Sequence, residues 1–303
     1  MERLRIPNLA TYLPVAPSDL LLAAPVAARV LFGLSPAGRA LQAAALGVYA
    51  GSALIDWAVR ADARRVDFED AFGFDPLSPP TASEEERRRD VEGLVERLNA
   101  NHVPMETPRK ELAKQVDLCL TDYLAELTGQ RLETSSQVRE FMLAQIVFPF
   151  ALGAADPLTG DVAIFRSTGI FEPHVIAHEF CHRKGYMKEV EAQVLGYFAL
   201  VRSGEPVLEQ SAHCERLDRQ LWVLAERDAA AYNGLLAEIG LREELKDAFA
   251  VRHPAEGPVS GVVGPMMKNA YNARMKLTGQ NGLSDYDEGF TNFILATERT
   301  ADS

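Results

Sequence analysis

The chain is poor in the residues that build several common classes of site. Its 303 residues include three cysteines, Cys119, Cys181 and Cys214, which lie far apart. An odd number of cysteines without close pairs is not a disulfide framework and favours a reducing compartment. The chain also lacks a basic surplus, because the net charge is −12 and the sequence pI is about 5.1. Nucleic acid is therefore set aside as a partner.

The N-terminus carries long apolar stretches that are not matched by a clear targeting signal. Residues 20–34 read LLLAAPVAARVLFGL and residues 40–59 read ALQAAALGVYAGSALIDWAV. They predict a helical hairpin that turns at residues 35–38. The second stretch has roughly the 20 residues needed to cross a bilayer, although polar residues interrupt it. A signal peptide fits poorly, because the apolar run begins late.

Two interpretations of this hairpin stand side by side. Small residues suit close helix packing in lipid, and they equally suit a buried hairpin of a soluble protein. In the first case residues 19–59 associate with the inner membrane, and the arginines that flank the hairpin favour cytoplasmic termini. In the second case the protein is cytoplasmic. Either way, residues 1–75 form an N-terminal unit and residues 83–303 a second domain.

The remainder of the chain predicts a mainly α fold (α+β) with a small sheet. Ser83 and Glu86 form a capping-box signature before an amphipathic helix. Another helix follows from Thr107 to about Leu127, and residues 162–165 (VAIF) read as a short strand. Further helices are expected at about 205–238, 241–252 and 262–279, and residues 290–296 form a closing helix or strand.

The strongest chemical signal is His178-Glu179-Phe-Cys-His182. Positions four apart share one face of a helix, so the two imidazoles can bind one ion. This is the His-Glu-x-x-His zinc pattern, in which the glutamate acts as general base rather than ligand. The apolar residues around the motif predict a buried helix, in which two histidines without a metal would lack partners.

A catalytic zinc also needs a third protein ligand and an open position. The first helix is expected to end at Gly185, and a second begins near Lys188 with Glu189 and Glu191 in its first turn. These two carboxylates point to nearly opposite sides, so only one can face the ion. Glu191 lies on the same side as the apolar Val194, Leu195 and Phe198, which predicts Glu191 as the third ligand and leaves Glu189 in solvent.

Other polar residues near the motif have less specific assignments. His174 lies four residues before His178 and is a candidate further ligand, supporting group or substrate contact. Tyr271, Tyr286 and His213 are candidate donors for an oxyanion, with packing as the alternative role of the tyrosines and a structural role as that of His213. Cys181 lies off the metal-facing side and is expected in the core.

With these residues placed, the sequence resembles a bacterial family of predicted zinc metallopeptidases of unknown function. The resemblance rests on DPLTGDVAIF (156–165), HEFCHRKGYMKEVEAQVLGYFAL (178–200) and the C-terminal residues 269–296. It implies a gluzincin-like catalytic domain with one Zn²⁺, preceded by N-terminal membrane helices. It implies ligand roles for His178, His182 and Glu191 and a base role for Glu179. Val190 and Gln193 depart from the family pattern, which has Asp and Asn there.

The sequence thus predicts a zincin-like metallopeptidase that hydrolyses peptide bonds of a peptide or protein substrate. Glu179 would move the protons, and the strand at 162–165 would hold an extended substrate. One alternative is a non-catalytic, membrane-associated zinc-binding protein, whose closed site would need His174 or Cys181 as a ligand. A di-iron carboxylate enzyme is a further alternative, but it needs a second Glu-x-x-His pair, which the sequence lacks.

Overall fold

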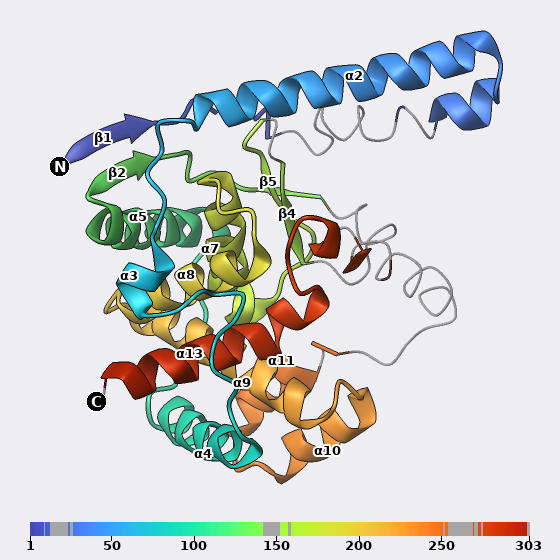
Figure 1. The fold of residues 1–303 in the computed structure, drawn as a ribbon. Coiled ribbons are helices and arrows are strands. Elements are labelled where there is room, and N and C mark those ends of the chain that lie inside the picture. Colours follow the sequence, from blue (N-terminus) through green and yellow to red (C-terminus); the bar gives the residue numbers. More distant parts are fainter. Residues whose placement is uncertain are drawn as a thin grey trace.

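The computed structural model describes residues 1–8, 10–12, 24, 27–141, 152–156, 159–250, 252–253, 269, 272–273 and 275–301. In this part of the chain helices dominate and strands are short, so the expected mainly α fold with a small sheet is confirmed (Figure 1). The helices are α2 (Pro36–Val59), α3 (Phe68–Phe72), α4 (Glu84–Ala100), α5 (Arg109–Thr128), α7 (Glu172–Arg183), α8 (Glu189–Val201), α9 (Pro206–Leu224), α10 (Ala229–Glu238), α11 (Glu243–Ala250) and α13 (Glu288–Ala301). Two 3₁₀ turns are η1 (Gly169–Phe171) and η2 (Leu283–Tyr286).

The strands form two small sheets. β1 (Glu2–Arg5) pairs in parallel with β2 (Gln130–Glu133). In the second sheet β5 (Val162–Ile164) is central, with β3 (Arg139–Glu140) parallel on one side and β4 (Gly153–Ala155) antiparallel on the other. The strand expected at residues 162–165 is therefore present, and among the described strands β4 lies at an edge of its sheet.

The N-terminal hairpin differs from the expectation in its turn. Residues 27–32 are helical and the turn lies at residues 33–35, so Pro36 begins α2 instead of lying within the turn. Proline favours the first position of a helix, because its missing N–H has no helical partner there. Residues 20–23 and 25–26, the start of the first apolar stretch, lie outside the described residues.

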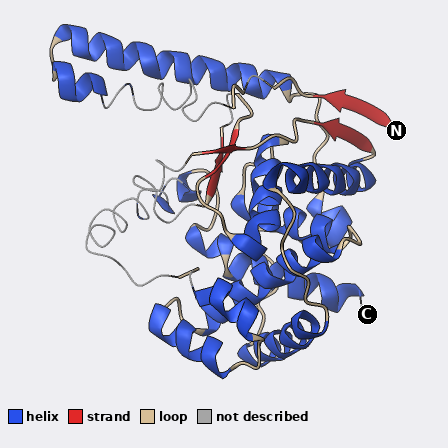
Figure 2. Cartoon of the chain, turned by 180° about the vertical axis from the view of Figure 1, so that it is seen from behind, coloured by secondary structure: helices blue, strands red, loops and turns tan. Residues whose placement is uncertain are grey.

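α2 runs along one end of the molecule, away from most of the other helices (Figures 1 and 2). The hairpin leaves several large apolar side chains exposed, namely Val30, Leu31, Phe32, Leu34, Leu41, Val48 and Leu54. Among the described helices none combines the length and the apolarity that a bilayer crossing requires. Membrane association of residues 19–59 stays a prediction.

Local chemistry accounts for most helix boundaries. Ser83 and Glu86 form both bonds of the predicted capping box at α4. α5 starts and ends within two residues of its prediction, and Gly129 closes it with φ +70°. The single helix expected at 205–238 is instead α9 and α10, because Glu226 and Arg227 both adopt positive φ between them. The closing segment is the helix α13, and most of the helix expected at 262–279 lies outside the described residues.

The main apolar core surrounds α7 and α8. Side chains of both helices are buried on nearly every face, against α5, α9 and α13. Gly196 permits the close contact of the two helices, since a Cβ there would lie 3.4 Å from the Cβ of Ala177 and from the amide nitrogen of His178. Polar side chains of α7 and α8 that lie inside this core therefore need hydrogen-bond partners within the protein.

A buried guanidinium joins four helices around this core. Arg216 of α9 donates to Asp90 of α4 at 2.6 and 3.0 Å, to Glu298 of α13 at 2.6 and 2.7 Å and to the Tyr197 hydroxyl of α8 at 3.0 Å. Its side chain is 5% exposed. The charge is thus fully paired, and its removal would leave Asp90 buried without a cation.

Arg216→Met is expected to lower the free energy of unfolding by about 3–5 kcal/mol, because one partner of a buried ion pair is lost. Arg88→Met provides the matched control, since Arg88 forms an exposed pair with Glu84 on α4 and such pairs contribute up to about 1 kcal/mol. Urea denaturation followed by circular dichroism measures both. Equal midpoints for the two variants would contradict the role given to Arg216.

Candidate metal centre

Two short helices that meet at a glycine build the candidate site. α7 begins with Pro173 in its first turn and ends at Arg183. The amide of Tyr186 donates to the carbonyl of Cys181 at 3.0 Å and the amide of Gly185 to that of His182 at 2.8 Å, while Gly185 has φ +96°. This pair of bonds is a Schellman end, which requires a left-handed residue. The predicted hinge at Gly185 is therefore confirmed.

The turn at Gly185 brings the start of α8 back beside α7, so that three potential ligand atoms lie close together. Nε2 of His178 lies 3.1 Å from Nε2 of His182, and Oε2 of Glu189 lies 3.1 Å and 3.2 Å from these two nitrogen atoms. Within the described residues this is the group of histidine, cysteine and acidic side chains whose geometry suits a metal ion. Each of these three atoms can bind either a proton or a metal cation, so the group could hold an ion between them.

Glu189, and not Glu191, is the carboxylate at this position. Glu191 is partly exposed and pairs with Lys188 at 3.1 Å, whereas Glu189 is 7% exposed. The prediction that Glu191 faces the imidazoles and Glu189 faces solvent is wrong. It treated the apolar side of α8 as its buried side, but α8 is buried almost all round, and Glu191 and Phe198 lie on its least buried face.

Neighbouring groups fix the orientation of these ligands. The carbonyl of Tyr186 lies 2.7 Å from Nδ1 of His182, which places the proton on Nδ1 and leaves the Nε2 lone pair for a cation. The amide of Glu189 donates to the side-chain oxygen of Gln280 at 2.9 Å. The aromatic ring of Tyr286 lies against His178, with ring centroids 5.9 Å apart.

The charges of the three residues are strongly coupled. Burial disfavours the charged form of Glu189, but the charge of His182 and hydrogen bonds from both imidazoles outweigh it, so the pKa of Glu189 falls well below its usual value. Burial acts in the same way on His182, where Glu189 outweighs it and the pKa rises to about 9. A proton between nitrogen and carboxylate and a metal cation would thus compete for the same place.

Glu179 lies one residue round α7 from His178, against the strand β4. Burial raises its pKa, and the two imidazoles and the amide of Ala155 oppose this rise. A Cβ at Gly153 would lie 3.0 Å from both Cγ and Oε1 of Glu179 and 3.1 Å from the carbonyl oxygen of Ala163. Glycine at this point of β4 thus makes room for the carboxylate.

The remaining candidates lie at different distances from this group. Tyr286 is beside it, as described, and Tyr271 lies outside the described residues. His213 is in a separate pocket of about 300 Å³ lined by α4 and α9, where it is 3.4 Å from Arg97. Cys181 is fully buried in the apolar core, as expected.

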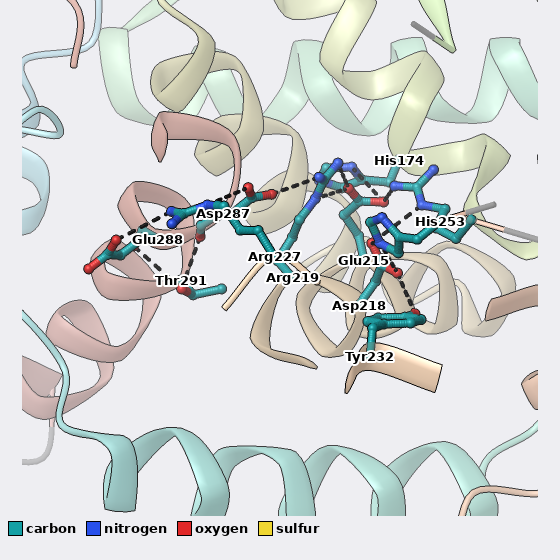
Figure 3. A network of polar contacts seen from close by, with 11 residues as sticks. His174, Glu215, Asp218, Arg219, Arg227, Tyr232, His253, Asp287, Glu288 and Thr291 are labelled. Atoms are coloured by element: carbon teal, nitrogen blue, oxygen red, sulfur yellow. Dashed lines mark hydrogen bonds and ion pairs between the residues drawn. The ribbon is translucent and has the colours of Figure 1, made fainter. Parts of the chain in front are cut away.

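His174 belongs to a buried polar network that the sequence did not reveal (Figure 3). Its Nδ1 lies 4.0 Å from Glu215 of α9, and burial lowers its pKa to about 4. Glu215 also binds Arg219, and Arg219 binds Asp287 at 2.8 Å. Asp218 accepts from Tyr232 at 2.7 Å and lies 3.1 Å from His253. Residues far apart in the sequence make this network, so no local pattern could have predicted it.

Comparison with known proteins gives a family but no function. The chain belongs to a family described as "Protein of unknown function (DUF3810)", whose model matches residues 39–294. No curated protein and no solved structure matches it.

The glutamates 189 and 191 offer a matched test of the site. Zinc should bind the wild-type chain at about one ion per molecule. Glu189→Gln should weaken zinc binding at least about a hundredfold, since even partners outside the ligand shell contribute 10–100-fold, whereas Glu191→Gln should bind as wild type does. Metal content after dialysis against graded chelator measures the difference. Loss of zinc from Glu191→Gln alone would contradict this assignment.

Proposed function

We propose that the protein is a zinc-dependent metallopeptidase with His178, His182 and Glu189 as ligands and Glu179 as general base. The observation that carries the proposal is the triangle of ligand atoms with edges of 3.1–3.2 Å. Zinc binds nitrogen and oxygen at about 2.0–2.2 Å in tetrahedral sites, which corresponds to edges of roughly 3.3–3.5 Å. Small movements of these side chains would accommodate the ion.

The donor set supports a catalytic rather than a structural role. Structural zinc sites use four protein ligands. The two residues that could supply the fourth, His174 and Cys181, lie outside the converging group: His174 is next to Glu215 and Cys181 is in the apolar core. The described residues therefore offer three ligands, which is the number that leaves one position open for a water or substrate.

A bound zinc ion would lower the pKa of a water and polarise the scissile carbonyl. Glu179 would accept the proton of the water and deliver it to the leaving amine. Its buried position supports this role, because burial raises its pKa from the usual carboxyl range towards that of an efficient general base. The ring of Tyr286 beside His178 makes its hydroxyl the best candidate for a donor to the oxyanion.

The substrate strand differs from the one expected from the sequence. β5 pairs on both sides, so residues 162–165 cannot hold an extended substrate. Among the described strands β4 lies at the edge of its sheet, and the residues that flank it, Leu152 and Asp156, bond to Phe165 and Asp161, which flank β5. Since successive residues alternate in direction, Gly153 and Ala155 turn their backbone groups to the outer edge, beside Glu179. An extended peptide pairing there would bring its carbonyl to the metal centre.

Glu179→Gln separates the base from the metal site. This variant should retain one zinc ion per chain, because Glu179 is not among the converging ligands. It should lose hydrolysis by a factor of about 10²–10⁴, the usual contribution of a general base. Cleavage of a fluorogenic peptide library and metal content together measure the two effects. Full hydrolysis by zinc-loaded Glu179→Gln would refute the mechanism.

Gly153→Ala tests the packing of β4 on the base. The added methyl group would displace Glu179 or the strand, because its contacts include backbone at 3.1 Å. Peptide hydrolysis is expected to fall at least about tenfold while zinc content is unchanged. Gly93→Ala is the control: a Cβ at Gly93 on α4 meets nothing within 4 Å and should stabilise the helix by about 0.5–1 kcal/mol. Unchanged hydrolysis in Gly153→Ala would show that β4 does not position Glu179.

A further inference from the structure

A second polar cluster lies beside α7 and has no part in the proposed proton transfers. It consists of Arg166 and Thr168, which follow β5, and Arg252, which follows α11. The guanidinium of Arg252 lies 4.4 Å from the ring centroid of Phe171. The amide of Phe171 in turn donates to the carbonyl of Thr168 at 3.2 Å. Phe171 thereby brings together the ends of two distant segments.

Arg252 is fixed by acidic side chains on one edge only. Nη2 donates to Glu215, and Nε lies 3.4 Å from Asp218. Nη1 lies on the remaining edge of the guanidinium. It is buried and has no hydrogen-bond partner in the part of the chain that the structure describes, although the side chain as a whole is 5% exposed. A buried donor of this kind is costly unless an acceptor reaches it.

Thr168 and Arg166 add further unused donors. The hydroxyl of Thr168 is also buried without a partner among the described residues. Burial and the charge of Arg252 lower the pKa of Arg166, and no carboxylate of the described residues offsets these effects. The carboxylate of Glu172 lies 3.4 Å from the Thr168 amide, but two hydrogen bonds from Arg109, of 2.6 and 3.0 Å, neutralise it.

The position of the cluster relates it to the proposed active site. Ile164 of β5 is opposite Gly153 of β4, and Gly153 packs on Glu179. Arg166 follows two residues later, in a bend beyond the end of β5 and thus at most about 7 Å from Ile164. On α7, His174 shares Glu215 with Arg252 and precedes His178 by one turn, or about 6 Å. The cluster is thus linked to Glu179 through the sheet and to His178 through α7.

We propose that Arg166, Thr168 and Arg252 form a subsite for a carboxylate of the substrate, linked to the proposed metal centre through α7. The identification of the substrate as a peptide rests on the proposed function. A carboxylate presents two coplanar acceptors, which the planar fork of a guanidinium matches. The substrate carboxylate comes either from an acidic side chain or from the C-terminus of the peptide.

Binding without turnover tests this subsite. The full chain carrying Glu179→Gln is loaded with zinc and titrated with fluorescent hexapeptides of random sequence in matched pools. One pair of pools contains Glu or Gln at one position, and another ends in a free or an amidated carboxyl group. Fluorescence anisotropy should show roughly tenfold tighter binding of the acidic member of one pair, because a charge-assisted hydrogen bond is gained. The pair that differs identifies the source of the carboxylate.

Three variants in the same background then assign the effect. Arg166→Gln should abolish the preference for the acidic member, and Thr168→Val should reduce it about threefold. Arg88→Gln, on the exposed side of α4, should leave it unchanged. Equal binding of acidic and neutral pools, no binding of either, or a preference that survives Arg166→Gln would overturn the proposal. Failure of the proposed function would appear separately, as absence of zinc-dependent cleavage of unmodified peptides by the wild-type chain.

Discussion

The structure depends on one constraint: two imidazoles and two carboxylates lie inside the apolar core, on α7 and α8. Removing such groups from water is costly unless each is paired. Glu189 meets both imidazoles, Tyr186 accepts from His182, and the amide of Ala155 donates to Glu179. A proton or a metal cation between these three ligand atoms would offset the cost of burying them. The same nitrogen and oxygen atoms that are costly to bury are therefore the atoms that could bind a metal ion.

The two residues that follow His182 anchor the end of α7 through many buried hydrogen bonds. The guanidinium of Arg183 donates to the carbonyls of Gly160, Ser135 and Gln137. Lys184 is fully buried, where its ammonium group meets Asp117 at 3.0 Å and donates to two threonine hydroxyls and the carbonyl of Leu132. Burial lowers the pKa of Lys184 and the charge of Asp117 opposes this. These contacts tie the metal-facing helix to α5 and β2, which fixes the imidazoles before any ion binds.

The sequence predicted those features that depend on local chemistry. The capping box of α4, the strand at 162–164, the glycine hinge and the burial of Cys181 follow from residues close together in the chain. The third carboxylate could not be assigned in this way. Periodicity separates an apolar from a polar side, but α8 is buried almost all round, so its two glutamates differ only in the tertiary contacts that each side makes. The positive-φ break between α9 and α10 and the network around Glu215 escaped prediction because contacts between distant segments determine them.

Electrostatic complementarity in this molecule is local and not a matter of net charge. The chain as a whole carries −12, yet unused buried donors gather at Arg252 and Thr168 while acceptors converge at His178, His182 and Glu189. The buried acids Glu215 and Asp218 hold Arg252 in place on one edge, so its other edge keeps its donor for something else. The group that could hold a cation and the cluster of unused donors are linked through α7, because His174, one turn before His178, shares Glu215 with Arg252. With the proposed function, a peptide with a carboxylate near its scissile carbonyl would engage both clusters.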